Sequence, residues 1–158
     1  MRWWLFKSEP ESYSWDDLVG DGRTCWEGVR NYQARNLMRD EIRVDDRVLF
    51  YHSNLQPQVV AGIARVASEA YPDHFAWDPA SRYHDPASTP EAPRWLMVDV
   101  EPVVAVEPPI TRDELKSLPE LADMMLLRRG SRLSIQPVTD DEAAAVLALR
   151  GITVEPEF

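Results

Sequence analysis

The chain has little of several features that define common protein classes. It contains one cysteine, Cys25, so it can build neither a disulfide framework nor a cysteine-based zinc site. No window approaches the roughly 18–20 apolar residues that a membrane helix needs. The first ten residues, MRWWLFKSEP, have too short an apolar run for a signal peptide. We therefore expect a cytoplasmic protein (nuclear in a eukaryote) with no membrane partner.

Basic residues are also scarce. The 17 Lys and Arg residues face 27 Asp and Glu residues, which gives a net charge of −10. This balance argues against a protein that coats duplex nucleic acid by charge alone. Two stretches differ: residues 23–47 hold six arginines against five acids, and residues 128–132 (RRGSR) hold three arginines and no acid. They predict a small basic cleft on an acidic body.

Length and composition predict one domain covering 1–158, because 158 residues with 44% hydrophobic content can bury a substantial core. The patterns of apolar residues indicate a mixed α+β fold of five or six strands. Strands are expected at 2–7, 46–53, 58–70, 94–106 and 131–138, with a bulge or edge near Pro102. The apolar runs in 46–53 and 58–70 suggest burial on both faces, as in a sheet curling into a barrel.

Helix starts are marked by capping residues. Ser14 with Asp17 predicts a short helix ending near Gly22, and Asn31 predicts a helix over about 32–40. Three capping-box matches predict helices at 112–117, 119–125 and 140–149, beginning at Thr111, Ser117 and Thr139 respectively. Residues 71–93, rich in proline and aspartate, predict a long loop packed against the body by its aromatic side chains.

The segment from Thr24 to Asn36 reads TCWEGVRNYQARN. It places Trp26, Asn31, Tyr32 and several arginines around a turn glycine. Aromatic faces, a carboxamide and guanidinium groups suit a planar ligand that carries a phosphate. Two interpretations stay open on these residues alone. Trp26 either lines a nucleobase pocket or fills the core, with the arginines paired to acids on a solvated face.

Catalytic and metal sites have weaker support. Cys25 and His52 could form a nucleophile and its base, but no local signature surrounds either residue. Ser131 and Ser134 lack the spacing of an esterase elbow, and there is no glycine-rich phosphate loop. The potential metal ligands of the long loop match no standard spacing: Asp73, His74, Asp78, His84 and Asp85. We expect no catalytic residue, no metal and no cofactor.

Seven blocks of the sequence, in order, resemble the EVE domain family. They are FKSEP (6–10), WEGVRNYQARN (26–36), VLFYHSN (48–54), AGIARV (61–66), AYPDHFAWDP (70–79), RWLMVDV (94–100) and LLRRGSRLSIQPVT (126–139). The resemblance implies a PUA-like pseudo-barrel of mostly antiparallel strands, related to the YTH and ASCH domains. It also implies a monomeric, non-catalytic reader of a modified base in nucleic acid. The leading candidates are 5-methylcytosine and 5-hydroxymethylcytosine in DNA, with modified RNA as a further option.

The resemblance also implies a site. Carried onto this sequence, the base-binding positions are Lys7, Ser8, Trp26, Val29, Asn31, Tyr32, Tyr51, His52, Ser53, Trp77 and Ser134, and the phosphate-binding positions are Arg35, Arg128 and Arg132. Trp77 is either a wall of the aromatic pocket or a core anchor. Cys25 departs from the family pattern, which favours a bulkier residue there.

Two other classes of function remain as alternatives. An ASCH-like hydrolase acting on a modified nucleoside would use Lys7, Glu9 or Arg35 near the same cleft. A protein-interaction module would leave the cleft without a nucleoside ligand.

Overall fold

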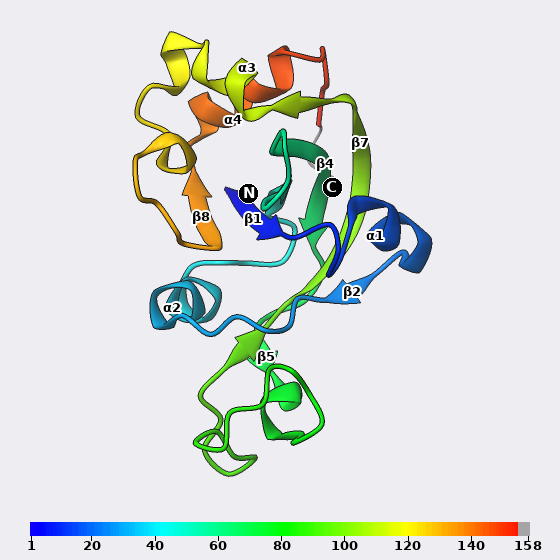
Figure 1. The fold of residues 1–158 in the computed structure, drawn as a ribbon, viewed down its shortest axis with the longest axis vertical. Helices are drawn as coiled ribbons and strands as arrows, with labels where there is room; N and C mark the ends of the chain where they lie inside the picture. Colours follow the sequence, from blue (N-terminus) through cyan, green and yellow to red (C-terminus); the bar gives the residue numbers. More distant parts are fainter. Residues whose placement is uncertain (155–158) are drawn as a thin grey trace.

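The computed structural model describes residues 1–154, which form a curled six-stranded half-barrel surrounded by short helices (Figure 1). The strand order is β2-β7-β4-β3-β1-β8, and a two-stranded β5-β6 ribbon lies apart from it. Only the β1–β3 pairing is parallel among the described strands. The expected mixed α+β fold with mostly antiparallel strands is confirmed.

The bounds of the elements follow the chain. The strands are β1 (Trp3–Ser8), β2 (Thr24–Cys25), β3 (Arg47–His52), β4 (Val59–Val66), β5 (Tyr71–Pro72), β6 (Leu96–Met97), β7 (Asp99–Thr111) and β8 (Ile135–Val138). The α-helices are α1 (Trp15–Asp21), α2 (Tyr32–Asp40), α3 (Arg112–Lys116) and α4 (Asp140–Ala148). Short 3₁₀ turns are η1 (His74–Trp77), η2 (Pro119–Leu121) and η3 (Met125–Leu127).

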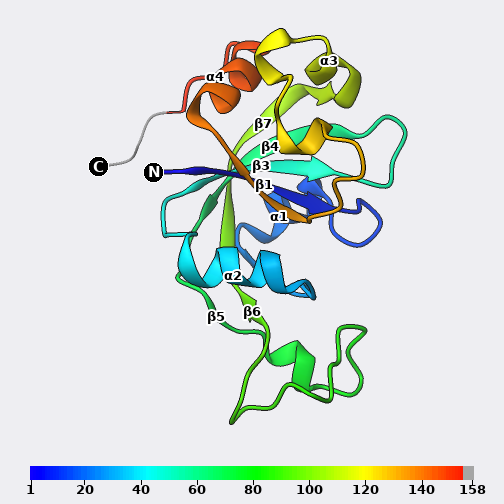
Figure 2. The same ribbon diagram turned by 90° about the vertical axis from the view of Figure 1, so that its left-hand side faces the viewer.

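Both faces of the sheet are buried, as the apolar runs predict. Side chains alternate along a strand, so Trp4 and Phe6 of β1 enter one hydrophobic cluster, while Trp3 and Leu5 enter another. The first cluster lies against α1 and α2 and the second against α3, η2 and α4. Figure 2 shows α3 and α4 over one end of the curled sheet and α2 at the other. All six residues of β3 are buried between the two clusters.

The predicted caps hold at four helices and fail at one. Ser14, Asn31, Thr111 and Thr139 each accept a hydrogen bond from the backbone of the first helical turn. The helix expected at 119–125 is wrong, because the chain forms two 3₁₀ turns, η2 and η3. Ser117 ends α3 instead, and its hydroxyl donates to the carbonyl of Glu114 at 2.6 Å. A serine three residues before a glutamate is a local signal, and here the preceding helix has already claimed the serine.

Two strand boundaries are shorter than expected and one irregularity is confirmed. Strand β4 ends at Val66 rather than 70, and β8 begins at Ile135 rather than 131. The pairing of β4 with β7 shifts register between Ile63 and Ala64, opposite Val104 and Pro102. Proline has no N–H to give to a sheet, so the bulge falls where Pro102 interrupts the ladder.

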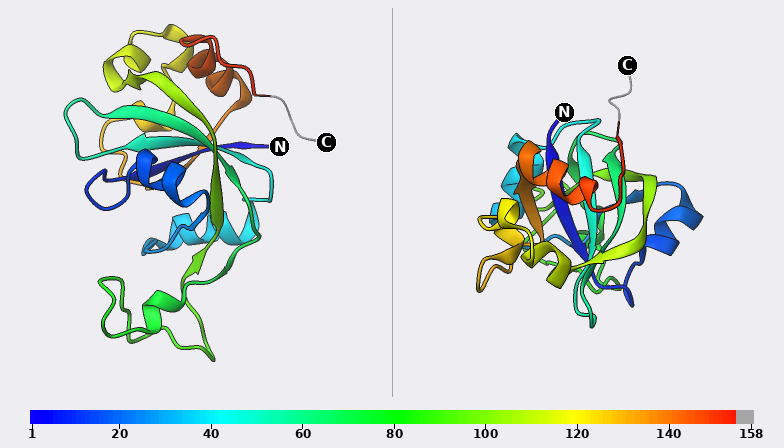
Figure 3. Two further views of the ribbon diagram at one scale, coloured as in Figure 1. Left: turned by 90° about the vertical axis from the view of Figure 1, so that its right-hand side faces the viewer. Right: turned by 90° about the horizontal axis from the view of Figure 1, so that it is seen from above.

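The segment from β5 to β6 projects beyond α2 and returns to the body (Figures 2 and 3). It contains η1 and the proline-rich stretch, and it lies beside the Trp26 segment through contacts described below. The long loop is therefore ordered against the body, as its aromatic residues suggest.

Candidate nucleic-acid interface

A cavity of about 590 Å³ opens beside the end of β1, and we call it the aromatic cavity. Its volume lies in the range of small-ligand sites, about 300–1,000 Å³. Its walls come from three segments distant in sequence: β1 and the turn after it, the Thr24–Val29 stretch, and the projecting segment. The lining side chains include Lys7, Ser8, Tyr13, Trp26, Glu27, Val29, Tyr83 and Ser134.

Trp26 serves both the core and the cavity. It is 8% exposed and its ring packs against Phe6 at 5.3 Å and Phe50 at 5.5 Å between centroids. Tyr13 meets the same ring edge-on at 6.5 Å. The indole also lines the aromatic cavity. The two interpretations of Trp26 are therefore compatible, because one part of the ring fills the core and the other forms a wall.

Tyr83 supplies the second aromatic wall, and Gly28 makes room for it. Gly28 has φ = 82°, and a Cβ built there would lie 2.6 Å from the Tyr83 ring. Glycine is thus required both for the backbone conformation and for the close approach of the ring. The guanidinium of Arg82 lies 5.0 Å from the Tyr83 centroid, a cation–π arrangement.

A buried ion pair attaches the projecting segment to the Trp26 stretch. The side chain of Asp73 has no exposed surface and accepts from Arg30 Nη1 at 2.9 Å and from the N–H of Gly28 at 3.0 Å. Arg30 also donates to the carbonyl of Tyr83, at 2.6 Å from Nη2 and 3.1 Å from Nε. We call this set of contacts the Arg30–Asp73 latch. It holds Tyr83 over Gly28.

The acidic groups of the cavity are unusual for a site near nucleic acid. Burial raises the pKa of Glu27, and the neighbouring charge of Asp73 raises it further. Its carboxyl group has no ion-pair partner within residues 1–154. Burial also raises the pKa of Cys25, so its thiol is a poor nucleophile. Burial lowers the pKa of His52, whose Nε2 accepts from the N–H of Trp15 at 3.3 Å.

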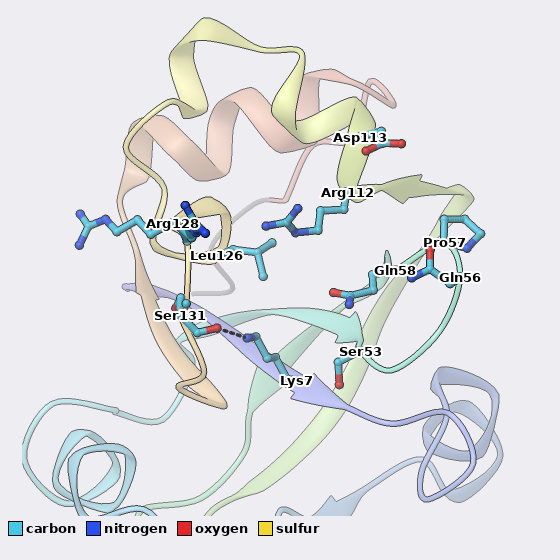
Figure 4. Close-up of a pocket in the computed structure, with 12 residues that line it drawn as sticks. Lys7, Ser53, Gln56, Pro57, Gln58, Arg112, Asp113, Leu126, Arg128 and Ser131 are labelled. Carbon is cyan, nitrogen blue, oxygen red and sulfur yellow. Dashed lines mark hydrogen bonds between the residues drawn. The ribbon is translucent and has the colours of Figure 1, made fainter.

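A second cavity, of about 490 Å³, lies on the other side of Lys7, and we call it the cationic cavity (Figure 4). It is bounded by the turn after β3, the start of α3 and the loop after η3. Its charged lining comprises Lys7, Arg112, Arg128, Arg129 and Asp113. Lys7 donates to the carbonyl of Ser131 at 3.4 Å, a long hydrogen bond that leaves most of its donor capacity free.

The structure brings together several of the predicted site residues. Lys7, Ser8, Trp26, Val29 and Ser134 line the aromatic cavity. Ser53 and Arg128 line the cationic cavity. Asn31, Arg128 and Arg132 line a shallower hollow of about 390 Å³ beside the start of α2.

Other predicted residues lie away from the aromatic cavity. Tyr32 is 50% exposed and stacks on Trp95 at 4.7 Å, on the outer side of α2, so it does not face Trp26. Arg35 lies 4.7 Å from the Tyr32 ring centroid and donates to Asn36 and to the carbonyl of Arg94. These side chains form an exposed cation–aromatic stack rather than a cage with Trp26.

Three more are held within the fold. Tyr51 is fully buried and its hydroxyl donates to Gln58 at 2.8 Å. His52 is buried beneath Trp15. Trp77 is partly buried in η1, and its indole nitrogen is buried without a partner in the described part of the chain.

Sequence reasoning missed four residues that the two cavities use: Tyr13, Glu27, Tyr83 and Arg112. Glu27 stands beside Trp26, so its place on the cavity wall was available as a local signal. Tyr83 and Arg112 carry no such signal, because a loop of more than twenty residues and a distant helix start bring them to the site.

Metal and membrane features were also sought among residues 1–154. That part of the chain holds no group of three or more His, Cys, Asp or Glu side chains able to bind a metal ion. None of its helices has the length and apolarity to cross a bilayer.

The curled half-barrel with its helix-capped ends and side cavities defines a PUA-like protein. Within that class the chain matches the EVE domain over residues 2–149, and it belongs to that family. The resemblance seen in the sequence is therefore confirmed.

Known relatives agree with this assignment. Human thymocyte nuclear protein 1 is 41% identical over 165 residues, covering 92% of this chain and 72% of the relative. A Pseudomonas syringae protein of known structure is 42% identical with a TM-score of 0.90, covering 94% of this chain and 99% of its own. The human thymocyte protein has been solved in complex with DNA containing 5-methylcytosine. That structure is 39% identical with a TM-score of 0.90, covering 98% of this chain and all of its own.

A Zymomonas mobilis ASCH protein shares the fold alone. It is 11% identical, with a TM-score of 0.51 over 94% of this chain.

Proposed function

We propose that this protein is a monomeric, single-domain, non-catalytic reader that binds a modified nucleobase, 5-methylcytosine or 5-hydroxymethylcytosine in DNA being the leading candidates. One observation carries the proposal: a 590 Å³ cavity with two aromatic walls and a free carboxyl group, in a fold whose human relative has been solved with 5-methylcytosine DNA. Modified RNA would offer the same base chemistry and is a further candidate.

The cavity has the groups that a flipped cytosine needs. Trp26 and Tyr83 offer π-faces, and a base stacked on an aromatic side chain gains about 1–3 kcal/mol. Glu27 can accept a hydrogen bond from the exocyclic amino group of cytosine, the usual partner of a carboxylate. Its raised pKa also favours a protonated carboxyl group, which can donate to the ring nitrogen. Val29 offers an apolar surface to a methyl group.

The remaining predicted residues take roles that follow from their positions. We assign Lys7, Ser8 and Ser134 to the base cavity, and Arg128 and Arg132 to phosphate. Ser53 lies toward the cationic cavity. The start of α2 carries Asn31, Tyr32 and Arg35 outside the aromatic cavity, and we assign them to the flanking strand. The buried Tyr51, His52 and Trp77 support the walls from within the fold.

A binding role suits the chemistry better than catalysis. The base that Cys25 would need is His52, and its Nε2 is occupied by the backbone of Trp15. The thiol itself has a raised pKa, so little thiolate forms at neutral pH.

The test is a titration of single- and double-stranded oligonucleotides carrying unmodified, methylated or hydroxymethylated cytosine. We expect tighter binding of a modified base. Trp26→Ala should abolish this preference, but it also removes core packing, so Glu27→Gln is the cleaner change. It should lower the preference for cytosine bases by about tenfold, the value of one good base contact. Glu41→Gln, an exposed acid outside the cavity, is the control.

Equal affinity across the whole oligonucleotide set would reject the reader. Release of a product from a modified nucleoside would instead support the hydrolase alternative. No response of the tryptophan fluorescence to any nucleoside or oligonucleotide would favour a protein-interaction module.

A further inference from the structure

The cationic cavity concentrates positive charge on a strongly acidic protein. Of its five charged lining residues four are basic, although the chain as a whole has a net charge of −10. The single acid, Asp113, is exposed. Figure 4 shows the side chains of Lys7 and Arg112 reaching into the same space from β1 and from the start of α3.

These cations lack the counterions that other basic residues have. Arg23, Arg65 and Arg150 each form salt bridges with acids. Within residues 1–154, the guanidinium groups of Arg112 and Arg129 have no hydrogen-bond or salt-bridge partner, although Arg112 is partly buried. A fold that pairs its arginines elsewhere thus leaves donors unpaired at one cavity.

Lys7 is held in a setting that disfavours its charge. Burial lowers the pKa of its ammonium group, and the charge of Arg112 lowers it further. Arg112 therefore lies near enough to repel Lys7. An anion placed between them would reverse the effect, since opposite charge favours the ionised form of an amine.

Lys7 also connects the two cavities, because it lines both of them. A nucleotide has its base and its phosphate only a sugar apart. A strand whose base enters the aromatic cavity therefore carries phosphates close to Lys7.

We propose that the cationic cavity is a phosphate site, which holds a phosphate of the strand whose modified base occupies the aromatic cavity. Arg112 and Arg129 are its main donors, with Arg128 at the rim and Lys7 shared between phosphate and base. This assignment rests on the proposed function for its ligand, whereas the affinity of the cavity for a phosphate group does not.

The chain offers a direct probe, because Lys7 and Lys116 are its only lysines. Labelling lysine with carbon-13 at Cε gives two resonances, and exposed Lys116 on α3 is the internal reference. We expect a single-stranded oligonucleotide carrying 5-methylcytosine to shift the Lys7 resonance and raise the pKa of Lys7. The Lys116 resonance should stay unchanged. Inorganic phosphate should produce the same change only at much higher concentration.

A matched pair of substitutions tests the donors. Arg112→Gln should weaken binding of modified and unmodified strands alike by about tenfold, the value of a charge-assisted hydrogen bond. The ratio of the two affinities should stay constant, because a phosphate contact carries no base information. Lys116→Gln removes one charge from the same helix outside the cavity and should leave affinity within about twofold.

The outcomes separate this inference from the proposed function. If strands bind without base preference yet Arg112→Gln still weakens them, the reader fails and the phosphate site stands. If base preference is intact but Arg112→Gln and Arg129→Gln both bind like the unaltered protein, the phosphate site is overturned. A Lys7 shift with inorganic phosphate but none with any strand also overturns it, because the cavity then binds only small anions.

Discussion

Single residues of the Trp26 segment each serve the core and the candidate site together. Trp26 packs on Phe6 and Phe50 while lining the aromatic cavity. Gly28 is needed for its positive φ and for the approach of Tyr83. Asn31 accepts from the N–H of Ala34, which occupies the carbonyl of a side chain predicted to read a base. At this scale stability and binding cannot be altered independently by large substitutions.

Gly28→Ala separates the two effects when it is compared with Gly22→Ala. Both glycines have positive φ, 82° and 73°, so both changes incur a backbone cost of about 1–2 kcal/mol. A methyl group at Gly28 would also displace the Tyr83 ring, whereas nothing lies within 4 Å at Gly22. We expect similar losses in the free energy of unfolding, measured by urea denaturation, but a loss of oligonucleotide binding only in Gly28→Ala. Equal binding by the two variants would remove Tyr83 from the site.

At the scale of elements, the helices follow local signals and the projecting segment follows distant ones. Helix α2 begins where its asparagine cap predicts, because an N-cap bond joins residues three apart. The segment from β5 to β6 is instead fixed by the Arg30–Asp73 latch, whose two residues lie 43 positions apart. Sequence reasoning predicted a packed loop, but the pairing partner of Asp73 could not be read from local spacing.

The latch predicts a specific cost for Asp73→Asn. The change keeps the size of the side chain but removes a buried charge that accepts from Arg30 and from two backbone N–H groups. We expect the free energy of unfolding to fall by about 2 kcal/mol, as for a hydrogen bond to a charged group. Proteolysis within 79–93 should become faster. Asp78→Asn, in an exposed position of the same segment, should change stability by less than about 0.5 kcal/mol.

At the scale of the whole molecule, an acidic body carries two adjacent cavities of different character. One has aromatic walls and a carboxyl group, the other has mainly basic side chains, and Lys7 lies between them. Most of the other arginines described are paired with acids or backbone carbonyls, so they add little attraction for a distant strand. Binding should therefore depend on the cavities rather than on the long-range field.

This charge distribution predicts a weak dependence of affinity on salt. With two or three phosphate contacts on a single strand, the logarithm of the association constant should fall with the logarithm of salt concentration with a slope of about −1.5 to −2. The measurement is a binding isotherm for a methylated strand at several salt concentrations, with an unmodified strand as the control. A slope steeper than about −4 would contradict it, because that requires a wide basic face.

The sequence by itself determined the alternation that buries both faces of the sheet, four of the helix caps, the bulge near Pro102 and the family. These depend on neighbours in the chain or on motifs that persist in order. Only the tertiary structure decided that Tyr32 faces away from Trp26, that Tyr83 takes its place, and that Arg112 meets Lys7. Cavity walls are made by residues far apart in sequence, and their meeting depends on how the sheet curls and where the loops return.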